Sequence, residues 1–169
     1  SSKPGVVGSS PATRIISKGK VFLWWYIHVE VYAMHEKKRK GDIGVAKAIA
    51  RLTELGWNVG IPITEHAPYD IFAEKEGDIE TVQVRYTTPK KNKLDVKLQT
   101  SWADKSGNHI KKRILSDYTV LAVYNPEFDE IYFIRSKDFV NDSCLTLRLV
   151  DTMNGQIKGV RMARDYLEL

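Results

Sequence analysis

Apolar residues recur every three or four positions between residues 42 and 55, which is the spacing of one face of an amphipathic helix. These positions are Ile43, Ala46, Ile49, Ala50, Leu52 and Leu55. Gly56 follows them, and glycine is the residue that most often ends a helix in the left-handed conformation. The pattern predicts a helix over residues 42–55, followed directly by a strand.

After this helix the pattern is that of short strands separated by turns. The expected strands are 57–63, 69–75, 79–87, 94–100, 118–124, 130–134 and 145–150, and the pair 118–124 and 130–134 forms a hairpin across residues 125–129. Residues 101–113 are expected to form a polar loop, Ser136 to cap one helical turn, and residues 160–167 to form a short terminal helix. A helix followed by a run of strands favours an α/β fold, with one mixed sheet flanked by helices.

Composition indicates how large a core the chain can form, the charge of its partner and its redox compartment. The 169 residues are 43% hydrophobic, enough for one sizeable core, and the net charge of +5 favours an anionic partner. Cys144 is the single cysteine, which excludes a disulfide framework and favours a reducing, cytoplasmic compartment. The longest apolar run, residues 21–33, is interrupted by His28 and Glu30 and is shorter than the ~20 residues of a membrane span, so we expect no membrane association.

Residues 1–34 differ from the rest of the chain. Residues 1–14 are rich in Gly, Ser and Pro, and no acid occurs before Glu30. The tetrapeptide Gly8-Ser9-Ser10-Pro11 is also a translation of the T-arm of a tRNA gene. Two origins fit: read-through of flanking DNA before a natural start at Met34, or a disordered tail followed by an edge strand. In both cases we expect an N-terminal extension over 1–34 and the functional domain over 35–169.

Candidate chemistry lies on two neighbouring strands. Asp70 begins one of them, and Gln83, Val84 and Arg85 lie on the next. Residues two apart on a strand share a face, so Gln83 and Arg85 project together while Val84 packs inward. Mg²⁺ prefers oxygen ligands, which the Asp70 carboxylate, the Gln83 amide and the Val84 carbonyl could supply. The alternatives are a turn residue at position 70 and a solvent-facing strand at 83–85; taken together, the residues favour a metal-dependent nuclease site.

Two basic segments follow these strands in the sequence. Their lysines and arginine suit contacts to DNA phosphates, which position DNA without reading its sequence, whereas amide and imidazole side chains could contact base edges. For any single basic run, and for the histidine, the alternative is a solvated loop. The expected DNA-binding residues are Lys90, Lys91, Lys93, Lys97, Ser101, Asn108, His109, Lys111, Lys112 and Arg113.

A family resemblance extends from about Lys40 to Tyr166 and depends on the order and spacing of several segments. They are Lys40-Gly41-Asp42-Ile43-Gly44, Pro68-Tyr69-Asp70, Val82-Gln83-Val84, Ser101 with the loop that contains Gly107, residues 118–133 with Tyr124-Asn125-Pro126, Leu145-x-Leu147-Arg148-Leu149, and Ala163-x-Asp165-Tyr166. In these segments the chain resembles the PD-(D/E)XK nuclease superfamily, and specifically the group I intron-associated homing endonucleases of bacteria. Such introns often lie in tRNA genes, which fits the first of the two origins for the N-terminal residues.

The resemblance implies a restriction-endonuclease-like fold, Mg²⁺ dependence, and site-specific cleavage of both strands of a long DNA target that promotes intron mobility. Because two antiparallel strands require two active sites, it also implies a homodimer or homotetramer. By matching positions, the resemblance makes Asp70 and Gln83 metal-site residues. The residue at position 85 is the catalytic cation.

Two residues depart from the family's pattern. The family usually has an acid on the first helix where this chain has Val45, and a lysine where it has Arg85. Valine binds no metal, and arginine keeps the positive charge but cannot act as a base. Asp42 or Lys47 of the same helix could substitute. One alternative is therefore a sequence-specific DNA-binding protein that has lost cleavage. A DNA junction resolvase, which shares the fold, is another.

Overall fold

The computed structural model describes residues 18–64, 66–112, 117–139, 143–151, 155–156 and 158–169. The chain divides into two compact units, Ser1–Lys37 and Lys38–Leu169, and the site lies in the second. In chain order the elements are α1 (Lys18–Glu54), β1 (Asn58–Gly60), β2 (Ile71–Lys75), β3 (Asp78–Tyr86), β4 (Lys93–Lys97), β5 (Gln99–Asp104), β6 (Gly107–Lys112), β7 (Val120–Asn125), β8 (Glu130–Arg135), the short 3₁₀ helix η1 (Ser136–Phe139), β9 (Cys144–Arg148), β10 (Arg161–Met162) and a second 3₁₀ helix, η2 (Ala163–Tyr166).

Helix α1 ends at Glu54, within a residue of the expected end, but it begins at Lys18 rather than at position 42. The sequence offers a reason, because residues 20–40 contain no proline or glycine to interrupt a helix, and Gly41 alone does not break it. Gly56 takes the expected left-handed conformation, with a φ of 83°. Among the described residues, no helix combines the length and the apolarity needed to cross a membrane.

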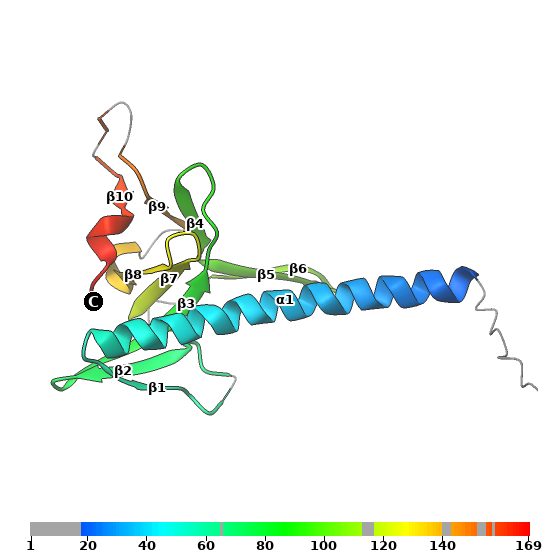
Figure 1. The fold of residues 1–169 in the computed structure, drawn as a ribbon, viewed down its shortest axis with the longest axis horizontal. Helices are drawn as coiled ribbons and strands as arrows, with labels where there is room; N and C mark the ends of the chain where they lie inside the picture. Colours follow the sequence, from blue (N-terminus) through cyan, green and yellow to red (C-terminus); the bar gives the residue numbers. More distant parts are fainter. Residues whose placement is uncertain (1–17, 65, 113–116, 140–142, 152–154, 157) are drawn as a thin grey trace, which may run out of the picture. The chain divides into compact units, whose positions relative to one another are not determined.

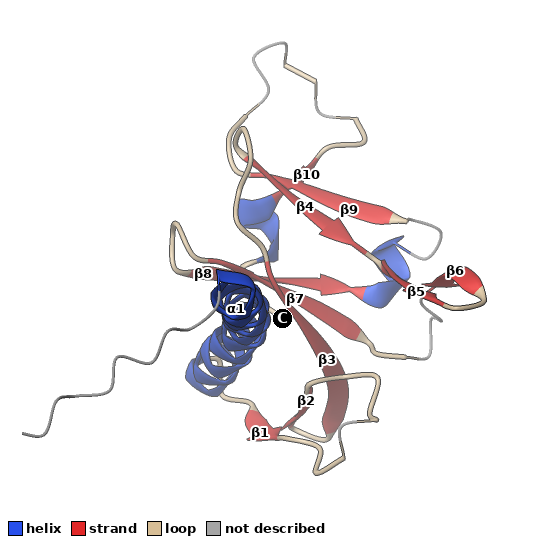
Figure 2. Ribbon diagram, turned by 90° about the vertical axis from the view of Figure 1, so that its right-hand side faces the viewer, coloured by secondary structure: helices blue, strands red, loops and turns tan. Residues whose placement is uncertain are grey.

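The strands form three sheets, so the expectation of one mixed sheet flanked by helices is wrong in part. The largest sheet has the order β1-β2-β3-β7-β8 and is mixed, with β3 and β7 parallel and the other pairs antiparallel. A second sheet has the order β10-β9-β4, and β5 and β6 form a two-stranded ribbon (Figures 1 and 2). Within the described part of the chain α1 is the one α-helix, and the expected helix at 160–167 is instead β10 followed by η2.

Two cores cover the two faces of the largest sheet. Strand β7 is buried along its whole length, and alternate residues enter different cores because side chains alternate between the faces of a strand. Ala122 belongs to the first core, where Ala48 and Leu52 of α1 pack. Leu121 belongs to the second core, which β4 and β9 help to form. The C-terminal part of α1 therefore covers one face of the sheet and the second sheet covers the other.

Helix α1 lies against β3 at Gly44. A Cβ atom built at Gly44 would lie 3.4 Å from Cγ1 of Val84 and 3.7 Å from Cβ of Tyr86. Both are ordinary contact distances, so α1 at Gly44 lies close to the segment of β3 that carries the candidate site. The packing of α1 thus holds Val84 in place.

Candidate active site

The site arises where β2 begins and β3 continues past it. The backbone N–H of Asp70 donates to the carbonyl of Val82 at 2.9 Å, and regular pairing of the two strands begins with Ile71 opposite Val82. Backbone groups of a strand point alternately to its two sides, so those of Val84 point to the same side as those of Val82. Because β2 does not extend that far, the N–H and C=O of Val84 are left for side chains to contact.

Four residues expected at the site meet at this strand end. Oδ2 of Asp70 accepts hydrogen bonds from the backbone N–H of Val84, at 2.7 Å, and from Nε2 of Gln83. The carbonyl of Val84 lies 3.5 Å from Nε2 of Gln83 and accepts a hydrogen bond from Nη1 of Arg85 at 3.3 Å. Asp70 and Gln83 are half-buried, whereas Arg85 is exposed. The structure therefore brings together a carboxylate, an amide, a carbonyl and a guanidinium.

The oxygen atoms of this group fit a hard divalent cation. Rotating the Gln83 amide by 180° would turn its Oε1 toward Asp70 in place of Nε2, an exchange that leaves the shape of the side chain unchanged. Asp70, Gln83 and the Val84 carbonyl would then offer three oxygens, and Mg²⁺ accepts such a set while keeping several waters. No group of three or more His, Cys, Asp or Glu suited to a metal occurs among the described residues. A metal at this site would therefore depend on the amide and carbonyl oxygens as well as on Asp70.

The first helix contributes differently from the expectation. Val45 is half-buried and packs against the first core. Nζ of Lys47 lies 2.7 Å from Oδ2 of Asp129, so this lysine is engaged with the β7–β8 turn and does not replace the missing acid. Asp42 is exposed. The three oxygens that could hold a metal come from the residue before β2 and from β3 rather than from the helix.

The ion pair of Lys47 belongs to a cluster that sequence reasoning missed. The hydroxyl of Tyr124 donates to Oδ1 of Asp129 at 2.8 Å. Hydrogen bonds from Lys47, and then from Tyr124, hold the pKa of Asp129 below its usual value. Burial, followed by the hydrogen bond to Asp129, raises the pKa of Tyr124 to about 12. No local pattern links residues 47 and 129, which are 82 positions apart.

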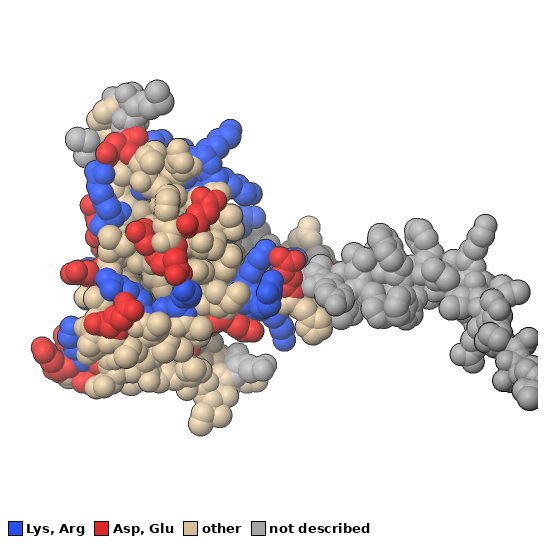
Figure 3. Space-filling model, viewed as in Figure 1, with Lys and Arg blue, Asp and Glu red and all other residues tan. Residues whose placement is uncertain are grey.

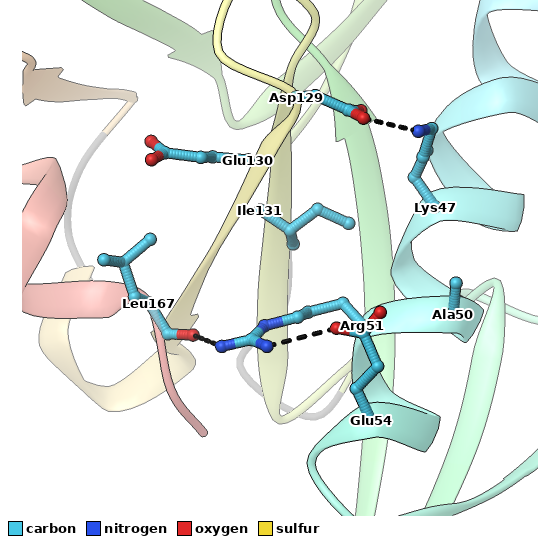
Figure 4. Close-up of a pocket in the computed structure, with 8 residues that line it drawn as sticks. All are labelled: Lys47, Ala50, Arg51, Glu54, Asp129, Glu130, Ile131 and Leu167. Carbon is cyan, nitrogen blue, oxygen red and sulfur yellow. Dashed lines mark hydrogen bonds and ion pairs between the residues drawn. The ribbon is translucent and has the colours of Figure 1, made fainter.

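A cavity of about 400 Å³ lies beside this cluster (Figure 4). Arg51 donates to Oε2 of Glu54 at 3.2 Å and to the carbonyl of Leu167 at 3.4 Å. Lys47 and Arg51 therefore link α1 to the β7–β8 turn and to Leu167. Because both side chains are engaged in these contacts, neither offers a free charge to a substrate in the cavity. Its lining residues are Lys47, Ala50, Arg51, Glu54, Asp129, Glu130, Ile131 and Leu167.

The first basic segment forms a tight turn before β4. The backbone N–H of Lys90 donates to the carbonyl of Lys93 at 2.8 Å, and the N–H of Lys93 donates back at 3.1 Å. Lys90, Lys91 and Lys97 are exposed, and Lys93 is half-buried. Figure 3 shows Lys and Arg side chains gathered near the β4 end of the unit, and acidic side chains around the β2–β3 turn. These positions are compatible with the expected phosphate contacts.

The second basic segment is a hairpin, so the expected polar loop over 101–113 is wrong. Strands β5 and β6 pair antiparallel from Gln99 opposite Lys112 to Asp104 opposite Gly107. Both strands are rich in polar residues, and they are joined by a turn at residues 105–106. Gly107, the first residue of β6, has a φ of 129° that favours glycine. Ser101, Lys111 and Lys112 lie on these strands, but their side chains are outside the described part of the chain, as is all of Arg113.

The tip of this hairpin is held by His109. Its Nε2 lies 3.0 Å from Oδ1 of Asp104 and 3.0 Å from Oγ of Ser106. Hydrogen bonds from Ser106, and then from His109, lower the pKa of Asp104. His109 thus braces the turn, while Asn108 beside it is exposed. A two-stranded ribbon of this kind fits the major groove of B-DNA.

Comparisons with known proteins agree with this geometry. The sequence profile described as PD-(D/E)XK endonuclease matches residues 35–169. A solved structure described as "The structure of a bacterial homing endonuclease: I-Ssp6803I" is similar to this chain, with a TM-score of 0.64 and 24% sequence identity, over 76% of this chain and 86% of that chain. No curated protein matches. The fold is therefore restriction-endonuclease-like, and the chain belongs to the PD-(D/E)XK endonuclease family.

Proposed function

We propose that this chain is a site-specific endonuclease of the homing type, which hydrolyses both strands of a DNA duplex with Mg²⁺ and promotes the mobility of a group I intron. The observation that supports this most directly is the meeting of Asp70, Gln83, Val84 and Arg85 where β2 begins. The similarity to the solved structure of a bacterial homing endonuclease supports the same assignment.

Each residue has a separate task in this proposal. Asp70, Gln83 and the Val84 carbonyl hold Mg²⁺, which when bound neutralises the scissile phosphate and lowers the pKa of the attacking water. The exposed guanidinium of Arg85 contacts a phosphate oxygen and stabilises the charge that develops on it. Because arginine stays protonated, Arg85 does not accept the proton of the attacking water, which leaves to solvent. Cleavage should accordingly become faster as the pH rises.

The β5–β6 hairpin and the turn at residues 90–93 hold the duplex in this proposal. The ribbon enters the major groove with Asn108 near its tip. The lysines of the hairpin and of the turn contact phosphates on either side of the Asp70 site. Cutting two antiparallel strands requires two copies of Asp70, so the active form is a homodimer or homotetramer.

A second function is favoured by the substitutions at the site. Val45 packs against the first core and Arg85 cannot act as a base, which together describe a DNA-binding protein on a nuclease scaffold that no longer cuts. The two functions share the fold and the DNA surface. They differ only in whether the bound duplex is hydrolysed.

A selection of bound duplexes followed by a cleavage assay separates the two. The wild type would first be used with Ca²⁺ to select binding sites, and then incubated with Mg²⁺ and a plasmid that carries a selected site. Linear product that disappears with EDTA supports the endonuclease. Specific binding without cleavage, with cutting gained by the variant Val45→Glu with Arg85→Lys, supports the second function. Absence of both binding and cleavage excludes both.

A further inference from the structure

We propose that Arg148 on β9, together with the lysine turn at residues 90–93, forms an additional contact to the DNA backbone on the outer face of the β4–β9 pair. This inference rests on the proposed function and adds a phosphate-binding residue to it. Strands β4 and β9 are antiparallel, and Lys93 lies directly opposite Arg148. The inward residues Leu94 and Leu147 are fully buried, so Lys93 and Arg148 share the opposite, outer face.

Two like charges directly opposite each other across a sheet destabilise it. In the described part of the chain neither Lys93 nor Arg148 forms an ion pair, whereas Arg164 pairs with Asp151 and Arg135 pairs with Glu80. The nearest acid along β4 is Asp95, and its Oδ1 accepts a hydrogen bond from the Thr146 hydroxyl at 2.6 Å. The opposed cations are therefore stabilised best by an anion from outside the chain.

The turn beside this pair is strained. Lys91 and Asn92 have φ angles of 50° and 59°, and positive values at both central residues are what a type I′ turn requires. Glycine and asparagine adopt this conformation readily, but lysine does so at a cost. The Asn92 carbonyl accepts the N–H of Leu149 at 3.0 Å, which fixes the turn against the end of β9. The lysine at position 91 thus adds a cation to a turn that is bonded to the end of β9, at a place where glycine would relieve the strain, which fits a functional role for its charge.

A duplex is the anion that suits the layout of these cations. Lys93, Lys97 and Arg148 lie on the outer face of one antiparallel pair, against the single acid Asp95 on β4. Strand β4 leads through Leu98 directly into β5, so the chain passes from this face straight into the hairpin that we assign to the major groove. Phosphates recur along a DNA backbone, and a row of cations on rigid strands can follow them while the hairpin is inserted.

The salt dependence of DNA binding tests the inference. Wild type, Arg148→Ala, Lys91→Gly and the control Arg164→Ala would each be titrated with a duplex that carries the selected site, in Ca²⁺, over a range of salt concentrations. Each phosphate contact contributes about 0.9 to the slope of log K against log salt. We expect Arg148→Ala and Lys91→Gly each to flatten the slope by about one. Arg164→Ala removes the same charge from an existing ion pair and should leave the slope unchanged.

Two further measurements separate this inference from a structural effect and from the proposed function. Lys91→Gly should unfold at the same temperature as wild type or higher, so weaker binding by a fold of equal stability would identify the charge as functional. Slopes of both variants equal to that of Arg164→Ala would overturn the inference, even with Mg²⁺-dependent cleavage intact. Flattened slopes in a protein that never cuts would overturn the nuclease and leave the contact standing. A wild type that does not bind the duplex would overturn both.

Discussion

Replacing Asp70 with asparagine separates the catalytic role of this residue from its structural one. Asparagine has nearly the same shape, and its Oδ1 can still accept the hydrogen bond that Val84 N–H now donates at 2.7 Å. Nε2 of Gln83 contacts the same oxygen of Asp70 and can keep donating to it. What is lost is the negative charge at the point where β2 begins.

The two consequences differ in size. A hydrogen bond to a charged group contributes roughly 1.5–3 kcal/mol and a neutral one 0.5–1.5, so Asp70→Asn should lower the free energy of unfolding by about 1 kcal/mol. A metal ion contributes several kcal/mol to the stabilisation of the transition state. If removing the carboxylate forfeits about 4 kcal/mol of that, the cleavage rate falls ~10³-fold. DNA binding without metal should be kept or become tighter, because a negative charge leaves the path of the phosphates.

The assay is single-turnover cleavage with saturating protein, measured beside urea unfolding and metal-free binding. Asp78→Asn is the matched control, because Asp78 is exposed at the first position of β3 and the charge change is the same. Cleavage by Asp70→Asn within about tenfold of the wild-type rate would remove Asp70 from the mechanism. An equal loss in Asp78→Asn would show that the effect is one of net charge.

Three other changes test separate parts of the structure. Arg85→Lys should raise the single-turnover cleavage rate at least ~10-fold at alkaline pH, because lysine can exchange a proton and general acid–base catalysis contributes about 10²–10⁴; a slower variant would contradict this. The pKa of Tyr124 is raised to about 12, so its contribution to stability is complete below pH ~10 and is lost as the pH rises toward 12. Tyr124→Phe should therefore lose less stability than wild type in urea unfolding between these pH values, and parallel curves would refute the argument. A Cβ at Gly41 meets no atom within 4 Å, so Gly41→Ala should stabilise the protein by about 1 kcal/mol in the same assay, whereas a neutral result would mean that this part of α1 frays.

The candidate site could be predicted from the sequence because the pairing that builds it is local. Strands β2 and β3 are joined by a turn at Glu76 and Gly77, which have φ angles of 53° and 90°, and this turn fixes the register that brings Asp70 beside Gln83. The alternation of side chains then places Gln83 and Arg85 together. The turn and the alternation of side chains both involve residues close in sequence, so the sequence alone was sufficient to predict this arrangement.

Other parts of the fold depend on contacts that leave no local pattern. The pairing of β4 with β9 places Lys97 opposite Cys144, and the sequence of neither strand indicates that the other is its partner. The same holds for Lys47 and Asp129, whose ion pair appears only once α1 lies beside the β7–β8 turn. The hairpin at 99–112 was missed for a different reason, because its sequence lacks the regular alternation of apolar and polar residues by which strands are recognised.

The two departures from the family's pattern have a common electrostatic consequence. With Val45 in the first core, Asp70 is the carboxylate that the strand end provides, and the Arg85 guanidinium lies beside the Val84 carbonyl. A cation at this site would meet one negative charge and one neighbouring positive charge, which weakens its binding to the protein alone. A DNA phosphate bound here would supply the missing negative charge to both the metal and Arg85. Metal and DNA should therefore bind cooperatively, each raising the affinity of the protein for the other. The complete site would then form only on the substrate.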